Sequence, residues 1–200
     1  MLTQEKINAN VVTYCNKLEK YGCYSEEMMK AIGDGIKNCP FGMSEDGGGA
    51  YQGGMVDVVL HNLCKLAHNI NEYGFGGEKT NHPLLKVNSN MLFKVLLLQH
   101  IAKAEMFVCT REQWKIKKGI FYDFNETLKS KLKLGERSIY LCQKYGIKLE
   151  EEEYEAMRSI DKTDENKGEV FCSPLCILVK FVNTLAAVEL KRKYISENSP

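Results

Sequence analysis

The stretch GGAYQGGMVDV, residues 48–58, decides how this chain is expected to fold. Its paired glycines predict a tight turn, because glycine reaches backbone conformations that other residues avoid. Beyond the second pair, apolar residues recur at helical spacing as far as about Glu72, with Met55 and Val58 on the inner face. The sequence therefore predicts a glycine-rich turn that leads directly into a buried helix.

Most of the remaining chain carries the apolar periodicity of helices. The expected helices cover residues 3–21, 25–37, 54–72, 88–105, 125–145, 149–160 and 174–194. Residues 114–124 instead alternate apolar and polar side chains on either side of Lys118-Gly119, which predicts a short β-hairpin. A polar linker is expected from Asp161 to Gly168. The predicted fold class is all-α with a small β-hairpin.

The size and charge of the chain narrow its organisation and its partners. Its 200 residues, 44% of them hydrophobic, fit one globular domain. Residues 1–37 are expected to form N-terminal helices, and residues 38–188 a core that carries the recognisable motifs. The net charge of +1 provides no field that would attract nucleic acid or an anionic membrane. Neither is expected as a partner.

Two further features favour a cytoplasmic location. The longest apolar run, residues 91–98, is interrupted by Lys94 and is much shorter than the roughly 20 residues of a membrane span. Near the N-terminus, Glu5 and Lys6 occupy positions where a signal peptide would carry apolar residues. We therefore expect a cytoplasmic protein.

Five segments resemble the motifs of the HD-domain superfamily of metal-dependent phosphohydrolases. They are residues 48–58, 95–103, 134–138, 149–160 and 174–186. In that family, histidines and aspartates from several helices bind one or two divalent metal ions, which orient water against a phosphoryl group. The resemblance implies an HD-like orthogonal helical bundle.

The positions that would bind metal in this family carry other residues here. The resemblance implies a vestigial pocket formed by Val58, Gln99, His100, Lys103, Leu134, Ile160 and Asn183. All of these except Lys103 replace a metal ligand of the family, and none of the replacements is a carboxylate. Gly48 similarly stands where the family has a histidine. We therefore expect no cofactor and no phosphohydrolase activity of the family type.

The resemblance implies a catalytically degenerate protein that acts as a ligand-binding or regulatory module. Its expected ligand is a phosphorylated small molecule or a nucleotide, held by the cations at Lys103, Arg137 and Arg158. The first alternative is an active phosphohydrolase that acts on a nucleotide or another phosphate ester with manganese, iron, nickel or zinc. The second is a structural interaction protein, for example a homodimer.

Two other groups of residues have a chemical and a structural interpretation. Asp57, His61, Cys64 and His68 share one helix face, so they could form a replacement zinc site or simply line the boundary between core and solvent. The second group is a pair of cysteines in the CxxxC segment at residues 172–176. The pair lacks the further ligands of a zinc motif, which favours ordinary packing of its thiols.

Overall fold

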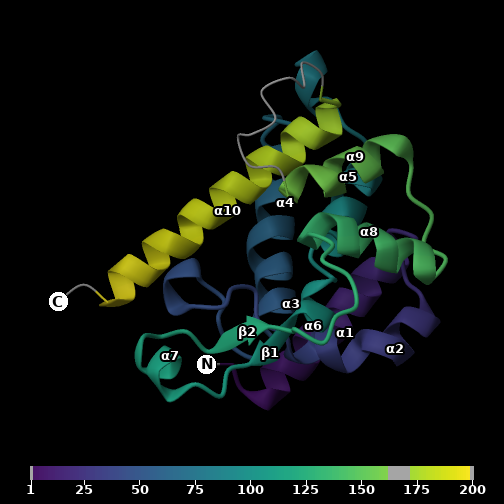
Figure 1. Ribbon diagram of the computed structural model, residues 1–200. Helices are drawn as coiled ribbons and strands as arrows, with labels where there is room; N and C mark the ends of the chain where they lie inside the picture. The colour runs from purple at the N-terminus through teal and green to yellow at the C-terminus, as the bar shows by residue number, and fades with distance from the viewer. Residues whose placement is uncertain (1, 162–171, 199–200) are drawn as a thin grey trace.

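The computed structural model describes residues 2–161 and 172–198 (Figure 1). Its described part is mostly helical, with one two-stranded antiparallel sheet. In chain order the elements are α1 (Gln4–Lys20), α2 (Glu26–Asn38), η1 (Glu45–Gly47), α3 (Gly54–Val58), η2 (Val59–Cys64), α4 (Lys65–Glu72), η3 (Pro83–Leu85), α5 (Ser89–Leu98), α6 (Lys103–Met106), β1 (Phe107–Cys109), α7 (Gln113–Lys117), β2 (Tyr122–Phe124), α8 (Leu134–Lys144), α9 (Glu151–Arg158), η4 (Ser159–Asp161) and α10 (Pro174–Asn198). The predicted all-α class with a small hairpin is confirmed at this level.

The first two helices begin where the sequence predicts, because hydroxyl side chains cap them. The Thr3 hydroxyl accepts a hydrogen bond from the amide of Lys6, and the Ser25 hydroxyl accepts one from the amide of Met28. Ser25 also donates to the carbonyl of Tyr145, 3.0 Å away, and this bond ties the start of α2 to the end of α8. The caps therefore fix both the helix starts and part of the tertiary structure.

The helix predicted over residues 54–72 forms, but it contains a π-helical turn. The element η2 has this wider winding and joins α3 to α4 in one continuous path. A π turn inserts one extra residue relative to the α-helical repeat and rotates every later side chain around the axis. The helical spacing assumed from the sequence therefore does not hold across residues 59–64.

The single helix predicted over residues 88–105 is wrong, because α5 ends at Leu98 and a turn precedes α6. The backbone carbonyl and amide groups at this break form hydrogen bonds with side chains of other helices. The buried hydroxyl of Tyr14 donates to the carbonyl of Leu97 at 2.6 Å. The Ser138 hydroxyl donates to the carbonyl of Gln99 at 3.0 Å and accepts from the amide of Ala102 at 3.3 Å. Side chains of α1 and α8 thus stabilise the break.

Of the two predicted hairpin strands, the one before Lys118-Gly119 is wrong, whereas the one after it is confirmed at residues 122–124. Residues 113–117 form the short helix α7, and β2 pairs instead with β1, with Phe107 opposite Phe124. The ammonium group of Lys115 bridges Glu112 at 2.7 Å and Asp123 at 2.9 Å. The ion pair with Asp123 holds α7 beside strand β2.

The helix predicted from Asn125 to Tyr145 begins nine residues later, at Leu134. The Asn125 side chain forms a turn instead of a helix cap, because it accepts bonds from both the amide and the hydroxyl of Thr127. Its amide group also donates to the carbonyl of Glu105 at 2.9 Å. The loop that follows can therefore run back toward the core before α8 starts.

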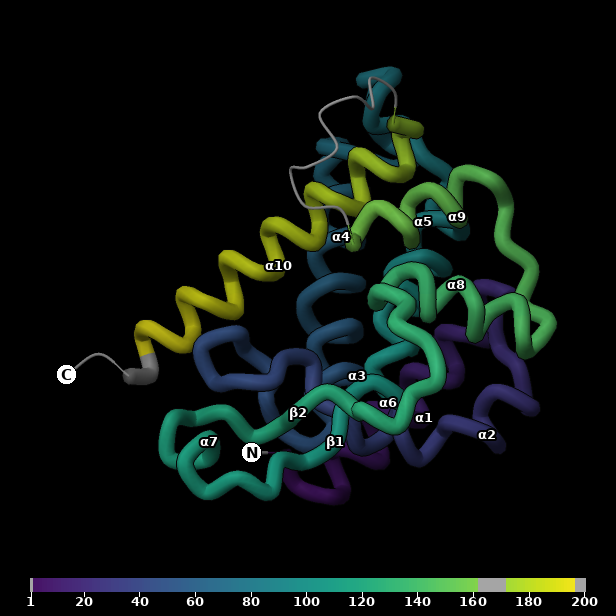
Figure 2. Tube along the Cα trace, viewed as in Figure 1, coloured from purple at the N-terminus to yellow at the C-terminus, as the bar shows by residue number. Residues whose placement is uncertain are grey.

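Helix α10 crosses the molecule diagonally and packs on α4, α5 and α9, as Figure 2 shows. It extends to Asn198, beyond the predicted end near Tyr194. All but the first residue of the predicted linker, Asp161–Gly168, lies outside the described residues. Among the described residues no helix combines the length and the apolar character that crossing a bilayer requires.

Candidate functional site

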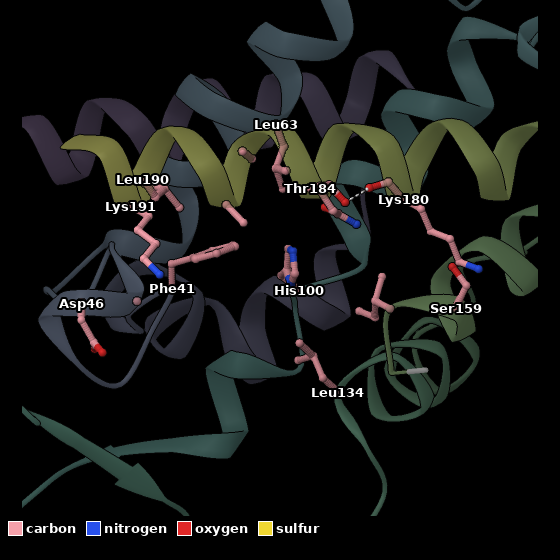
Figure 3. Close-up of a pocket in the computed structure, with 15 residues that line it drawn as sticks. Phe41, Asp46, Leu63, His100, Leu134, Ser159, Lys180, Thr184, Leu190 and Lys191 are labelled. Atoms are coloured by element: carbon pink, nitrogen blue, oxygen red, sulfur yellow. Dashed lines mark hydrogen bonds between the residues drawn. The ribbon is translucent and has the colours of Figure 1, made fainter. Parts of the chain in front are cut away.

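A cavity of about 600 Å³ lies between α10, the 41–47 loop, the start of α8 and η4 (Figure 3). The residues that line it are Phe41, Asp46, Gly47, Leu63, His100, Leu134, Ser159, Ile160, Lys180, Asn183, Thr184, Ala186, Ala187, Leu190 and Lys191. Its size falls within the range of about 300–1,000 Å³ that is usual for small-molecule sites. The surface of the lining is mostly apolar, so the polar groups that reach it can select a ligand.

His100 is the most informative of these polar groups. Only 7% of its surface is exposed, and its ring points into the cavity. Neither ring nitrogen has a hydrogen-bond partner among the described residues. Burial, and secondarily the nearby charge of Lys103, lowers the pKa of His100 well below its usual value. The ring is therefore neutral at physiological pH, with one donor and one acceptor nitrogen.

Lys103 does not reach the cavity but supports its wall. Its ammonium nitrogen donates to the carbonyl of Phe41 and lies 3.6 Å from the centre of the Phe41 ring. The Phe41 ring in turn meets His100 edge to face, with 4.8 Å between the ring centres. Burial lowers the pKa of Lys103 to about 7. Lys103 thus fixes the position of Phe41, and Phe41 fixes that of His100.

Gln99 and Asn183 satisfy each other. The Gln99 amide nitrogen donates to the Asn183 oxygen, and the Asn183 nitrogen donates to the Gln99 oxygen, each over 3.0 Å. Gln99 is fully buried, whereas Asn183 also lines the cavity. The pair joins α10 to the end of α5, and any movement of the Asn183 side chain toward a metal ion would strain or break these two bonds.

The other positions that the resemblance assigns to metal ligands carry aliphatic residues or a glycine with no room for a side chain. Leu134 and Ile160 line the cavity, whereas Val58 is buried beside Gly49. Gly48 has φ +71°, and a Cβ atom placed there would lie 2.8 Å from the Cβ of Leu190. A histidine at position 48 would therefore be strained and would displace α10.

The two arginines predicted to bind phosphate are not among the residues that line the cavity. Arg137 is buried, donates to the carbonyl and hydroxyl of Ser130, and pairs with Glu105 at 3.4 Å. Arg158 is exposed at the end of α9. The amides at the N-terminus of α8 are also occupied, since Asp161 accepts bonds from residues 135 and 136. The structure does not bring Lys103, Arg137 and Arg158 together at one site.

Several residues of the cavity were missed from the sequence, and most of them lie on α10. Lys180, Leu190 and Lys191 lie about one or two helical turns from Asn183 and so share its face, and Thr184 is adjacent to it in the chain. Once Asn183 is assigned to a pocket, this spacing could have found them. Phe41 lies in an irregular loop and has no comparable signal.

The alternative zinc site on the third predicted helix does not assemble. Asp57 accepts bonds from Asn10 at 2.9 Å and Tyr51 at 2.6 Å, and its distance to the His61 ring nitrogen is 3.7 Å. Across residues 2–161 and 172–198, the group of metal-binding side chains that converges lies elsewhere, at Glu155 and the CxxxC cysteines. The Asp57 cluster is therefore a network at the surface of α1.

The described residues thus bring His100, Leu134, Ile160 and Asn183, which are separated in sequence, to one cavity. Gln99 and Lys103 lie directly behind its wall, in contact with Asn183 and Phe41. No protein-family model, no curated protein and no solved structure matches the chain.

Proposed function

We propose that this chain is a degenerate HD-like module that binds a small molecule in the cavity at His100 and does not hydrolyse it. The observation that carries the proposal is a buried, neutral imidazole that faces about 600 Å³ of mostly apolar space and whose two nitrogens have no partner among the described residues. Burying polar atoms without partners costs about 1–3 kcal/mol per group. A ligand that bonds to both nitrogens would recover that free energy.

The HD-like part of the proposal is supported by the positions of the residues that the resemblance selected, several of which line the same cavity. The resemblance selected residues from segments spread over more than half of the chain, and four of them line one cavity. The replaced ligands cannot recreate a family-type metal centre. Leu134 and Ile160 have no lone pair, and Asn183 is committed to Gln99. Water activation by a metal ion therefore has no support at this site.

The lining indicates an amphipathic ligand. Phe41, Leu134 and Ile160 provide a surface for a flat apolar or aromatic part, and the neutral His100 requires a group that can both donate and accept. The exposed ammonium groups of Lys180 and Lys191 stand on the same wall and can pair with an anionic end. A phosphorylated small molecule or a nucleotide meets these requirements, with the two α10 lysines in place of the expected cations.

Binding can be tested with a panel of nucleosides, nucleotides and sugar phosphates. The primary measurement is the NMR shift of the His100 imidazole in protein with labelled histidine, supported by thermal stabilisation. A cognate ligand should move the His100 signal and raise the melting temperature of the wild type but not of His100→Leu. The exposed His82 provides the matched control, since His82→Leu should keep the full response. A ligand that stabilises His100→Leu equally would place binding elsewhere.

Hydrolysis requires a separate measurement. Purified protein is equilibrated with manganese, iron, nickel and zinc, and phosphate release from the same panel is followed. We expect no turnover with any metal. Metal-dependent turnover that is lost in Asn183→Ala would overturn the proposal and favour the active phosphohydrolase.

A further inference from the structure

A second group of reactive side chains lies outside the cavity wall, where α9 meets the start of α10. One carboxylate oxygen of Glu155 and the two sulfur atoms of Cys172 and Cys176 all lie within 4.8 Å of one another. Cys176 is buried, whereas Cys172 and Glu155 are half-buried. Both thiols are free, so the group is intact for chemistry.

The first turn of α10 fixes this arrangement. The Ser173 hydroxyl accepts a hydrogen bond from the amide of Cys176 at 3.2 Å, and Pro174 occupies the first helical position. The amide of Ser173 donates to a carboxylate oxygen of Glu155 at 3.0 Å, which draws that side chain from α9 onto the end of α10. The hydrogen bonds at the start of α10 therefore position Glu155 of α9 next to Cys176 of α10.

Burial raises the pKa of the Cys176 thiol, so a metal ion must displace the thiol proton in order to bind there. The positive end of a helix dipole stabilises negative charge, and both sulfur atoms lie at the N-terminal end of a 25-residue helix. Two thiolates with one carboxylate are a donor set for zinc, and the fourth tetrahedral position can be taken by water. Each thiol would release its proton to solvent as its sulfur–metal bond forms.

We propose that Glu155, Cys172 and Cys176 bind one zinc-class divalent cation. With bonds of about 2.0–2.3 Å, the ligand atoms of a tetrahedral zinc ion are about 3.3–3.8 Å apart. The three ligand atoms, which lie within 4.8 Å of one another, can therefore approach to this distance by rotation of their side chains. Lys180, whose ammonium nitrogen lies 3.7 Å from the Cys172 sulfur, is exposed and can turn to solvent as the cation enters.

A bound cation would crosslink α9 to α10. Glu155 precedes residues 162–171 in the chain and the two cysteines follow them, so the metal would close a loop between the two helices. Closing a loop lowers the entropy of the unfolded chain, and a ligand that binds only the folded state stabilises it. None of its three ligands lines the cavity, so the site does not rest on the proposed function, although the two sites meet at Lys180, which lines the cavity and contacts Cys172.

Cobalt(II) provides a direct spectroscopic test on the full chain, reduced and freed of metal by a chelator. We expect one equivalent of cobalt to produce thiolate-to-cobalt charge-transfer absorbance, and zinc to displace it. Cys172→Ser and Cys176→Ser should each abolish the band, and Glu155→Gln should weaken binding by about tenfold or more. Cys109→Ser, which removes an exposed thiol, should leave the titration unchanged.

A second measurement needs no variant. Zinc should protect the half-buried Cys172 of the wild type from alkylation, as mapped by mass spectrometry, while the exposed Cys109 continues to react. Absence of a stoichiometric band together with absence of protection would overturn the site. A band that survives both Cys172→Ser and Cys176→Ser would do so too.

Discussion

Replacing His100 with leucine should make the ligand-free protein more stable, and more so in acid. Leucine has a similar volume but no polar atoms, so it removes two buried nitrogens that have no partner among the described residues. The gain of about 1–3 kcal/mol per unsatisfied group is reduced by about 0.5–1.5 kcal/mol from the lost ring contact with Phe41. With two such groups, we expect a net gain of about 0.5–5 kcal/mol near neutral pH.

The pH dependence follows from the lowered pKa of His100. In the unfolded chain the imidazole takes up a proton below about pH 6.5, while the folded protein keeps it neutral. The free energy of unfolding of the wild type therefore falls as the pH drops below this value. His100→Leu has no imidazole at this position and does not show this loss. The difference in the free energy of unfolding between His100→Leu and the wild type should therefore grow by about 2 kcal/mol as the pH falls from about 7.5 to 5.

Urea denaturation followed by circular dichroism at several pH values measures this difference. His82→Leu serves as the control, because an exposed ring is solvated in both states. A difference between His100→Leu and the wild type that stays constant with pH would refute the reasoning about burial. Lower stability of His100→Leu at neutral pH would show that the imidazole has partners after all.

Three further predictions concern the residues around His100. Burial lowers the pKa of Lys103 to about 7, so the wild type should gain about 2 kcal/mol relative to Lys103→Met as the pH rises from about 7 to 9, measured by urea denaturation. Gln99→Leu or Asn183→Leu alone should each cost about 1–3 kcal/mol by leaving one amide unpaired, whereas the double variant should cost less than the sum in a double-mutant cycle. Gly48→Ala should cost about 1–3 kcal/mol, seen as a lower melting temperature, because of its positive φ and the contact with Leu190; an unchanged melting temperature would contradict this.

The elements that could be predicted from the sequence are those whose signals are local. Caps at Thr3 and Ser25 and the apolar periodicity of α1, α2, α9 and α10 depend on residues a few positions apart. The break after α5 could not be predicted in this way. No glycine or proline marks it, and its backbone groups are satisfied by Tyr14 and Ser138 from other helices.

The same distinction applies to the site. His100, Leu134, Ile160 and Asn183 were predicted from short motifs, and they line the cavity because those motifs lie at its walls. The phosphate-binding set came from the same motifs, as the cations that they retain near the expected pocket. Charge type does not reveal whether a cation is free, and tertiary contacts direct Arg137 to Ser130 and Lys103 to Phe41.

The close approach of Gly48 to Leu190 has a consequence for any attempt to build a metal centre at the cavity by mutation. A histidine at position 48 requires α10 to move, yet the pairing of Gln99 with Asn183 holds α10 in place. Changing either member of that pair first leaves a buried amide without its partner. Each single substitution therefore lowers stability before any metal can compensate. The mutational route to such a centre is therefore epistatic, and several simultaneous replacements would be needed to follow it.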